Sequence, residues 1–276
     1  MGAKLNGIEV DWRERGRGEV ILFIHGFPFN SVMWQPQLAA LPRGWRGIAP
    51  DLRGFGATTD GPESVYDMEL YARDLIALLD HIEAERAVVC GLSMGGYVAF
   101  RMWELCRPRI RAFVLCDTRA GADSPEAARA RARLAERVRV EGTRPVVDAM
   151  LSKMISFSTR HAQPGTVELV RAMMREAPPE SIARALLGMA RRPDSEPLLR
   201  TIDVPTLIVM GADDAITTRG QAEMLARGIR GGRLETIEHA GHLPNLEQPA
   251  AFNRALDQFL EGLPLTTFSV GTSLAF

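Results

Sequence analysis

A serine flanked by glycines is the strongest chemical signal in this chain, in the pentapeptide Gly91-Leu92-Ser93-Met94-Gly95. An apolar, β-branched run, Ala87 to Cys90, precedes it, and a helical apolar pattern follows it as far as Arg107-Pro108. The serine is therefore predicted on a sharp strand-to-helix turn, where a strained backbone holds its hydroxyl out over the sheet edge. A side chain at either glycine would collide where strand and helix nearly touch. The alternative is a glycine-rich turn whose serine only caps the helix.

A serine hydroxyl at its ordinary pKa is a poor nucleophile and needs a histidine base that is oriented by an acid. The chain supplies Ser93, Asp214 and His242 in that order, each in a turn directly after a predicted strand. We therefore expect the sheet to bring all three to one edge. Asp213 is a neighbour that we expect to face solvent or to brace its loop, and His239 is a neighbour that we do not expect to act as the base. Asp117, which follows an earlier predicted strand, is a third candidate for the acid.

The segment His25-Gly26-Phe27-Pro28 follows the apolar run Glu19 to Ile24. Open α/β sheets place their ligands in such loops, at the carboxyl ends of strands. Two interpretations of His25 remain open: a catalytic role, or the one we favour, in which the ring holds the loop by hydrogen bonding. In the second interpretation the backbone N–H of Phe27 points into the site.

The elements that must position these residues alternate between strand and helix. Weak alternation over Leu5 to Trp12 predicts an antiparallel edge strand, followed by a charged turn over 13–18. Continuous apolar runs predict strands buried on both faces. These runs are Glu19–Ile24, Gly47–Pro50, Ala87–Cys90, Ile110–Asp117, Pro205–Gly211 and Arg233–Glu238, and helices are predicted over Tyr66–Ala84 and Ala250–Gly262. The fold class is therefore α/β, with a mostly parallel central sheet flanked by helices.

Between Ala120 and Leu199 the alternation stops, and only helical patterns are found. We expect residues 1–119 and 200–263 to form one α/β core, residues 120–199 a helical cap, and residues 264–276 a C-terminal tail. Ser124-Pro125-Glu126 opens the insertion with a helix N-terminal signature. Further helices are predicted around 145–154, 165–176 and 179–191. The arginines between 129 and 139 alternate with acids and an apolar stripe, which indicates a solvated amphipathic helix.

Apolar side chains of the insertion are candidates for the lining of a substrate pocket. Methionine suits both ordinary cores and adaptable substrate walls, because its side chain is flexible. The candidates are Met150, Met154, Phe157, Met173, Met174 and Met189. None of them carries a charge, so they predict a neutral, apolar acyl or aryl group.

Composition bounds the class of protein. Lys+Arg 33 against Asp+Glu 34 gives a formal net charge of -1, so no global field draws the chain to nucleic acid or to an acidic membrane. The uncharged stretch Val20 to Pro42 is too broken by polar residues and prolines to cross a membrane, and the N-terminus shows no signal peptide. We therefore expect a cytoplasmic enzyme. The three cysteines lack C-x-x-C spacing, and neither a disulfide, a metal nor a cofactor is predicted.

The uncharged segment Pro264 to Phe276 matches neither helical nor strand periodicity. We expect it to dock on an apolar surface of its own subunit or of a second copy, which leaves a homo-oligomer open. A frayed terminus is the alternative.

With these motifs the sequence resembles the α/β-hydrolase superfamily, over residues 5 to 262. The resemblance rests on His25-Gly26-Phe27-Pro28, Gly91-Leu92-Ser93-Met94-Gly95-Gly96, Gly211-Ala212-Asp213-Asp214 and Gly241-His242. Together with the segment 51–56 (DLRGFG), they look like the group of 3-oxoadipate enol-lactonases, small carboxylesterases and cofactor-free haloperoxidases. The resemblance implies an α/β-hydrolase fold with a helical cap after the sixth strand. It also implies an oxyanion hole made by the backbone N–H groups of Phe27 and Met94.

The resulting prediction is a serine hydrolase that cleaves small or medium neutral carboxylic esters through an acyl-Ser93 intermediate. A lactone hydrolase acting on a carboxylate-bearing substrate is the first alternative, with Arg53 and Arg119 as candidates to hold that carboxylate. A C–C bond hydrolase or a cofactor-free perhydrolase would use the same triad, and a non-enzymatic hydrolase-like receptor is the alternative from another class. Serine at position 93 argues against haloalkane dehalogenase and epoxide hydrolase chemistry, for which the resemblance would demand aspartate there.

Overall fold

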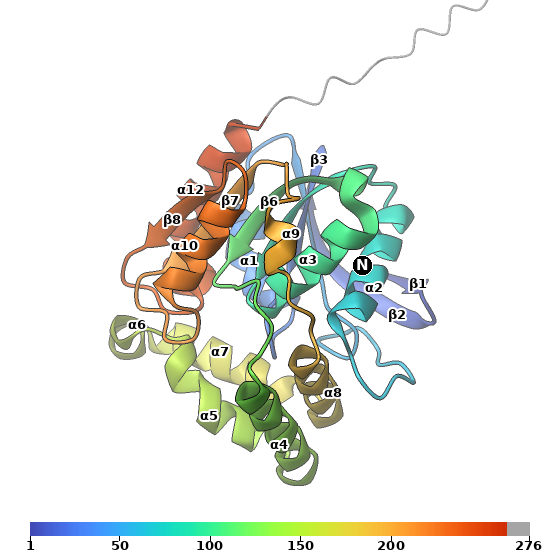
Figure 1. The fold of residues 1–276 in the computed structure, drawn as a ribbon, viewed down its shortest axis with the longest axis vertical. Coiled ribbons are helices and arrows are strands. Elements are labelled where there is room, and N and C mark those ends of the chain that lie inside the picture. The colour runs from blue at the N-terminus through green and yellow to red at the C-terminus, as the bar shows by residue number, and fades with distance from the viewer. Residues whose placement is uncertain (264–276) are drawn as a thin grey trace, which may run out of the picture.

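The computed structural model describes residues 1–263. Their strands form one eight-stranded sheet (Figure 1). The strands lie in the order β1-β2-β4-β3-β5-β6-β7-β8. All pairs from β4 to β8 are parallel, while β1 and β2 run antiparallel to their neighbours. The strand bounds are β1 Gly2–Leu5, β2 Ile8–Gly16, β3 Glu19–Ile24, β4 Trp45–Pro50, β5 Ala87–Leu92, β6 Ile110–Cys116, β7 Thr206–Gly211 and β8 Arg233–Ile237. This is the mostly parallel α/β sheet that the apolar runs predict. The predicted docking of 264–276 falls outside the described residues.

The N-terminal edge differs from the sequence prediction. The segment expected to be one strand and a charged turn is a hairpin, β1 and β2, that turns at Asn6 and Gly7. Both turn residues have positive φ, 46° and 82°, which is the geometry that Asn-Gly favours in a two-residue hairpin loop. The charged residues from Arg13 onward continue β2, because that strand pairs with β4 as far as Gly16.

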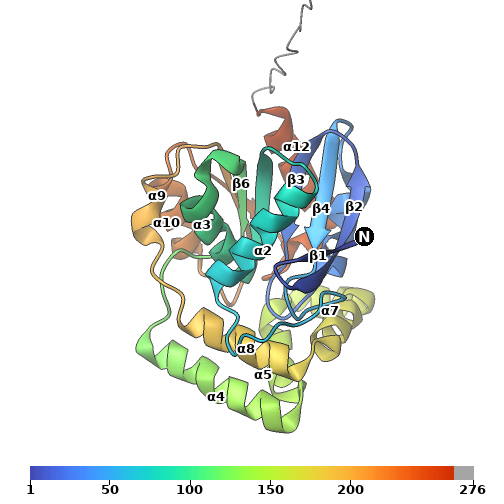
Figure 2. The ribbon, with the colours of Figure 1, turned by 90° about the vertical axis from the view of Figure 1, so that its right-hand side faces the viewer.

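Helices cover both faces of the central strands, which are buried along almost their whole length. Helices α2 and α3 pack against each other (Figure 2). Helices α1 and α12 are also in contact. The bounds of these and the remaining core helices are α1 Gln35–Ala40, α2 Met68–His81, α3 Met94–Cys106, α9 Glu196–Leu199, α10 Arg219–Gly228, α11 Pro244–Glu247 and α12 Pro249–Glu261, with 3-10 turns at Ser31–Trp34 and Arg107–Arg109. Within residues 1–263 no helix combines the length and apolar character that crossing a bilayer requires.

Helices α4 to α8 form a separate group between β6 and β7, beyond one end of the sheet (Figures 1 and 2). Their bounds are α4 Pro125–Glu141, α5 Arg144–Met154, α6 Phe157–Ala162, α7 Pro164–Glu176 and α8 Pro179–Ala190. Ser124 caps α4 as predicted, and α4 packs along α8. Helix α6 was not expected from the sequence. With 6 residues, α6 is too short for its apolar residues to show helical periodicity. The Ser156 hydroxyl caps the helix by accepting a hydrogen bond from the Thr159 N–H.

A buried ion cluster joins the two segments that connect these helices to the sheet. The Asp123 side chain is fully buried and makes ion pairs with Arg119, Arg131 and Arg192 at 2.6 to 2.8 Å. The Arg192 guanidinium also lies 4.3 Å from the ring centre of Tyr97 on α3. Asp123 lies before α4 and Arg192 after α8, so one carboxylate ties the entry of the helical group to its exit.

Candidate active site

Ser93 occupies the turn between β5 and α3. Its φ of 53° and ψ of -111° lie outside the regions that a serine ordinarily adopts, which is a conformation that costs about 1–3 kcal/mol. Its backbone is held on both sides, because its N–H donates to the Cys116 carbonyl and its carbonyl accepts from the Thr118 hydroxyl. The strained strand-to-helix turn predicted from the pentapeptide is thus present, and the side chain is half-buried.

The glycines of this turn are there because β5, α3 and β3 approach closely. A Cβ on Gly91 would lie 2.4 Å from the Gly95 carbonyl oxygen, and one on Gly95 would lie 2.3 Å from that of Ile24. Real Cβ atoms do not tolerate such distances, so any side chain here would push the helix off the sheet.

Asp214 and His242 come from the loops after β7 and β8 and form a hydrogen-bonded pair. Asp214 Oδ2 lies 2.9 Å from His242 Nδ1, and Asp214 Oδ1 accepts from the N–H groups of Ile216 and Thr217. Burial acts to raise the pKa of Asp214, but His242 and these two N–H groups outweigh it and lower the pKa. His242 Nε2 is buried and has no hydrogen-bond partner among the described residues. The pair therefore presents an imidazole whose second nitrogen remains able to accept a proton.

Glu247 holds the histidine loop, and sequence reasoning did not identify it. Its Oε1 accepts from the N–H groups of Gly241 and Leu243, the two neighbours of His242, at 2.8 and 3.2 Å. Its Oε2 accepts from the Ser156 N–H at 2.8 Å, and the His242 N–H donates to the Met154 carbonyl. A carboxylate that is 1% exposed thus fastens the loop to the segment between α5 and α6. The one signal in the sequence was the position of Glu247, an acid that follows His242 by five residues.

His25 has the structural role that we favoured. The Leu52 N–H donates to His25 Nε2, so Nδ1 carries the proton and donates to the Gly26 carbonyl, each at 2.9 Å. Complete burial lowers the pKa of His25, which keeps the ring neutral. Both nitrogens are therefore occupied in bracing the loop.

The two backbone groups expected to form an oxyanion hole flank the serine. Phe27 follows Gly26, and a Cβ on Gly26 would lie 3.5 Å from the Cβ of Ser93, so this loop passes directly beside the serine. Met94 is the first residue of α3, where backbone N–H groups have no partner within the helix. Within residues 1–263 neither N–H donates to another backbone or side-chain group.

The neighbouring acids and histidine lie in different environments. Asp213 and His239 are both exposed. Asp117 is 1% exposed, and its Oδ1 accepts from the Gly211 N–H at 2.8 Å. One ligand atom each from Asp117, Asp214 and His242 lie within 4.8 Å of one another. This cluster has the donor types of a cation site, but the Nδ1 of its histidine already binds Asp214.

Most of the predicted pocket residues are buried side chains of the helical group. Met154, Met173, Met174 and Met189 are buried, whereas Met150 is half-buried. Met154 also contacts the histidine loop, because its carbonyl accepts a hydrogen bond from the His242 N–H. The prediction for Phe157 is wrong. Its side chain is 68% exposed and stacks on His161 at 4.0 Å between ring centres, on the outward face of α6, whereas Thr159 in the same turn is buried.

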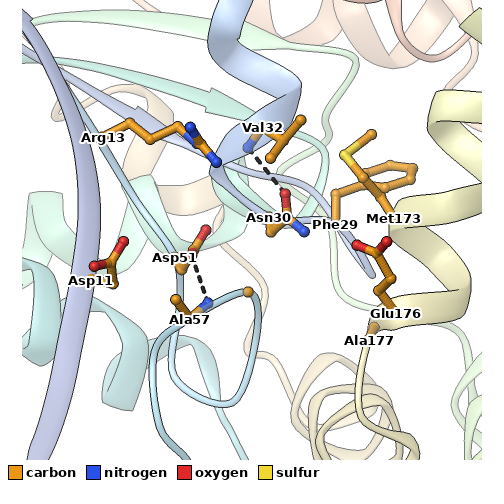
Figure 3. A pocket seen from close by; sticks show the side chains of 11 residues that line it. Asp11, Arg13, Phe29, Asn30, Val32, Asp51, Ala57, Met173, Glu176 and Ala177 are labelled. Atoms are coloured by element: carbon orange, nitrogen blue, oxygen red, sulfur yellow. Dashed lines mark hydrogen bonds between the residues drawn. The ribbon is translucent and has the colours of Figure 1, made fainter. Parts of the chain in front are cut away.

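A cavity of about 250 Å³ lies beside the loop that follows β3, between β2, the loop after β4 and the end of α7 (Figure 3). Phe29 and Met173 form its apolar wall, and the remainder carries three acids and one base: Asp11, Asp51, Glu176 and Arg13. Ser93, Asp214 and His242 do not line it, so this cavity is distinct from the serine site.

The profile of the Alpha/beta hydrolase family matches residues 21–255. The chain is 30% identical to 3-oxoadipate enol-lactonase 2 of Acinetobacter baylyi over 241 residues, which cover 87% of this chain and 88% of the relative.

Two solved structures are similar throughout. A thermophilic esterase from Thermogutta terrifontis, solved with malate bound, has a TM-score of 0.92 and 41% identity and covers 95% of this chain and 98% of its own. The enol-lactonase from Burkholderia xenovorans LB400 has a TM-score of 0.88 and 29% identity over 95% of this chain and 100% of its own.

Proposed function

The chain belongs to the alpha/beta hydrolase family, and we propose that it is a serine hydrolase that cleaves neutral carboxylic esters through an acyl-Ser93 intermediate. Ser93 is the nucleophile, His242 the general base and acid, and Asp214 the acid that orients the imidazole. Helices α4 to α8 act as the cap over this site.

The reaction begins when Ser93 Oγ attacks the ester carbonyl carbon while His242 Nε2 takes the hydroxyl proton. The carbonyl oxygen becomes an oxyanion, which the N–H groups of Phe27 and Met94 stabilise; such donors contribute about 3–4 kcal/mol each. Collapse of this intermediate breaks the C–O bond, and the imidazolium gives its proton to the leaving alcohol. Water then repeats the sequence, with His242 as base, and releases the acid and the free serine.

The observation that carries this proposal is the Asp214–His242 pair. Its 2.9 Å hydrogen bond fixes the tautomer with the proton on Nδ1 and leaves Nε2 as a buried acceptor without a partner among the described residues. Together with the strained backbone of Ser93, this arrangement supports nucleophilic catalysis over a purely binding role.

The preference for a neutral substrate is supported by the two arginines that were candidates to hold a carboxylate. Arg53 is engaged by Asp74 through two hydrogen bonds and by Glu63 through a third, and its side chain is 1% exposed. Arg119 pairs with Asp123 at 2.7 Å. Both guanidinium groups therefore have structural partners.

A hydrolase for carboxylate-bearing lactones or esters is the second candidate function. One observation favours it: Asp123 is shared by Arg119, Arg131 and Arg192, so the cluster carries more positive than negative charge. The Arg119 Nε atom is buried and has no hydrogen-bond partner among the described residues. The enol-lactonases among the similar proteins support this candidate function.

A matched substrate series separates the two candidates. We expect kcat/KM for neutral p-nitrophenyl esters of graded acyl length to exceed that for esters and lactones of the same length with a terminal carboxylate. Arg119→Gln is expected to leave this ranking unchanged, and Arg129→Gln, on the exposed face of α4, serves as the control. A preference for the carboxylate series that Arg119→Gln abolishes and Arg129→Gln retains would establish the second candidate instead.

A further inference from the structure

Asp117 is a buried titratable group that the proposed mechanism does not use. It follows β6 with a φ of 43°, a left-handed conformation that aspartate and asparagine tolerate better than most residues. Its Oδ1 accepts the Gly211 N–H, whereas its Oδ2 is buried and has no conventional hydrogen-bond partner among the described residues. An unpaired carboxyl oxygen in this position requires a physical explanation, because leaving a buried polar atom unsatisfied is costly.

The titratable groups that face Asp117 come from three neighbouring elements. Asp214 lies in the loop after β7 and His242 in the loop after β8, each with a polar atom within 4.8 Å of the Asp117 carboxyl. Cys116 precedes it on β6, and the Cys116 thiol lies 4.0 Å from that of Cys90 on β5. No lysine or arginine pairs with Asp117 among the described residues.

Two carboxyl groups so close together do not both ionise in a buried site, and their environments decide which one keeps the proton. Asp214 has the imidazole and two backbone N–H groups to stabilise its charge. Asp117 has a single backbone N–H. Burial and the charge of Asp214 raise the pKa of Asp117 well above its ordinary value, whereas the pKa of Asp214 is lowered.

We propose that Asp117 is a positioning residue: a neutral carboxylic acid whose Oδ2–H donates a hydrogen bond to the Asp214 carboxylate and so fixes the group that orients His242. This inference rests on the proposed triad. It accounts for the unpartnered Oδ2, because a protonated Oδ2 is a donor and the neighbouring Asp214 carboxylate is its acceptor. It also separates Asp117 from Asp214 in role, since only Asp214 carries the charge that stabilises the imidazolium.

The protonation state is tested by thermal stability, without reference to activity. A buried carboxyl with a raised pKa binds more protons in the folded state than in the unfolded state, so the contribution of Asp117 to wild-type stability falls as pH rises above about 4. Asp117→Asn keeps a donor and an acceptor but cannot ionise on unfolding. Its Tm relative to wild type is therefore expected to rise by about 2–4 °C or more between pH about 4 and pH about 7. A Tm difference that is constant or falls over this range would overturn the proposal.

The positioning role is tested by the pH dependence of kcat/KM on an activated ester. Asp117→Asn supplies an N–H₂ donor to Asp214, so the acidic limb is expected to stay at its wild-type pH, with kcat/KM within about threefold. Asp117→Ala removes the donor, and Asp214 then holds the imidazolium more strongly. Its acidic limb is expected to move to higher pH by about half a unit or more.

The outcomes distinguish this inference from the triad beneath it. An acidic limb that moves to lower pH in Asp117→Asn would show that Asp117 is ionised, and unchanged limbs in both variants would show that it does not act on His242. Either result overturns the positioning role. Full activity in Asp214→Asn would instead contradict the proposed triad, while the Tm measurement on Asp117→Asn would stand independently.

Discussion

The carboxylate of Glu247 fixes the backbone on both sides of His242. One of its oxygens accepts hydrogen bonds from the N–H groups of the residues immediately before and after that histidine. Its other oxygen reaches the Ser156 N–H between α5 and α6. The position of the imidazole is therefore coupled to the helical group through a single buried side chain.

Replacing Glu247 by glutamine is expected to lower both kcat/KM and Tm. In glutamine an N–H₂ group replaces one carboxylate oxygen, so at least one backbone N–H loses its acceptor. A hydrogen bond to a charged acceptor contributes about 1.5–3 kcal/mol to stability. We expect kcat/KM to fall by about 10- to 100-fold. Glu238→Gln, an exposed acid on the same loop, is the control. Equal behaviour of the two variants in activity and thermal denaturation would contradict the role of Glu247.

The choice of acid is tested by three separate substitutions, Asp117→Asn, Asp213→Asn and Asp214→Asn. Only Asp214 bonds to His242 Nδ1, so its asparagine variant is expected to lose about 10³- to 10⁴-fold in kcat. Asp213 is exposed, and its variant is expected to remain near wild type. A larger loss at position 117 or 213 than at 214 would refute the assignment.

Asp123→Asn is expected to destabilise the fold. Removing the one carboxylate shared by Arg119, Arg131 and Arg192 leaves buried positive charge unpaired, which costs about 3–5 kcal/mol. Asp148→Asn, at an exposed pair on α5, is the matched control and is expected to change Tm little. If the Tm of Asp123→Asn equals that of the control within error, the ion cluster does not stabilise the fold.

The same cluster predicts a pH dependence of stability. Burial opposes ionisation of Asp123, but Arg131 and Arg192 outweigh it and lower the pKa of the carboxyl. A lowered folded-state pKa gives stability that is present above the unfolded value of about 4 and is lost as pH falls through the folded value. The Tm difference between wild type and Asp123→Asn should therefore be large at pH 7 and shrink below pH about 4. A difference independent of pH would contradict this role.

The sequence predicts the central strands and the turn at Ser93 well, because burial on both faces leaves unmistakable apolar runs such as Glu19–Ile24 and Ala87–Cys90. It fails where short-range chemistry decides, as at the Asn6-Gly7 hairpin and the short helix α6. It also fails where a side chain's direction depends on packing. Phe157 has the character of a pocket residue but faces solvent, and Glu247 has the character of a surface acid but is buried.

The roles of Asp117 and Asp123 lie beyond sequence reasoning for a different reason. Each depends on groups that are distant along the chain, Asp214 in one case and Arg192 in the other. Only the fold brings these charges together, so neither the protonation of Asp117 nor the triple pairing of Asp123 leaves a local pattern. The order Ser93, Asp214, His242 could be recognised because each residue lies in the turn or loop that follows a strand.

The reaction of Ser93 itself decides whether the protein is a serine hydrolase. Purified wild type and Ser93→Ala are incubated with a fluorophosphonate, the modified peptide is identified by mass spectrometry, and hydrolysis of p-nitrophenyl acetate is measured in parallel. We expect labelling of the wild type at Ser93 with loss of activity, and no labelling and at least about 10⁴-fold lower kcat in a Ser93→Ala variant of unchanged Tm. Ester hydrolysis that persists in Ser93→Ala, or labelling of the wild type at another residue, would contradict the account.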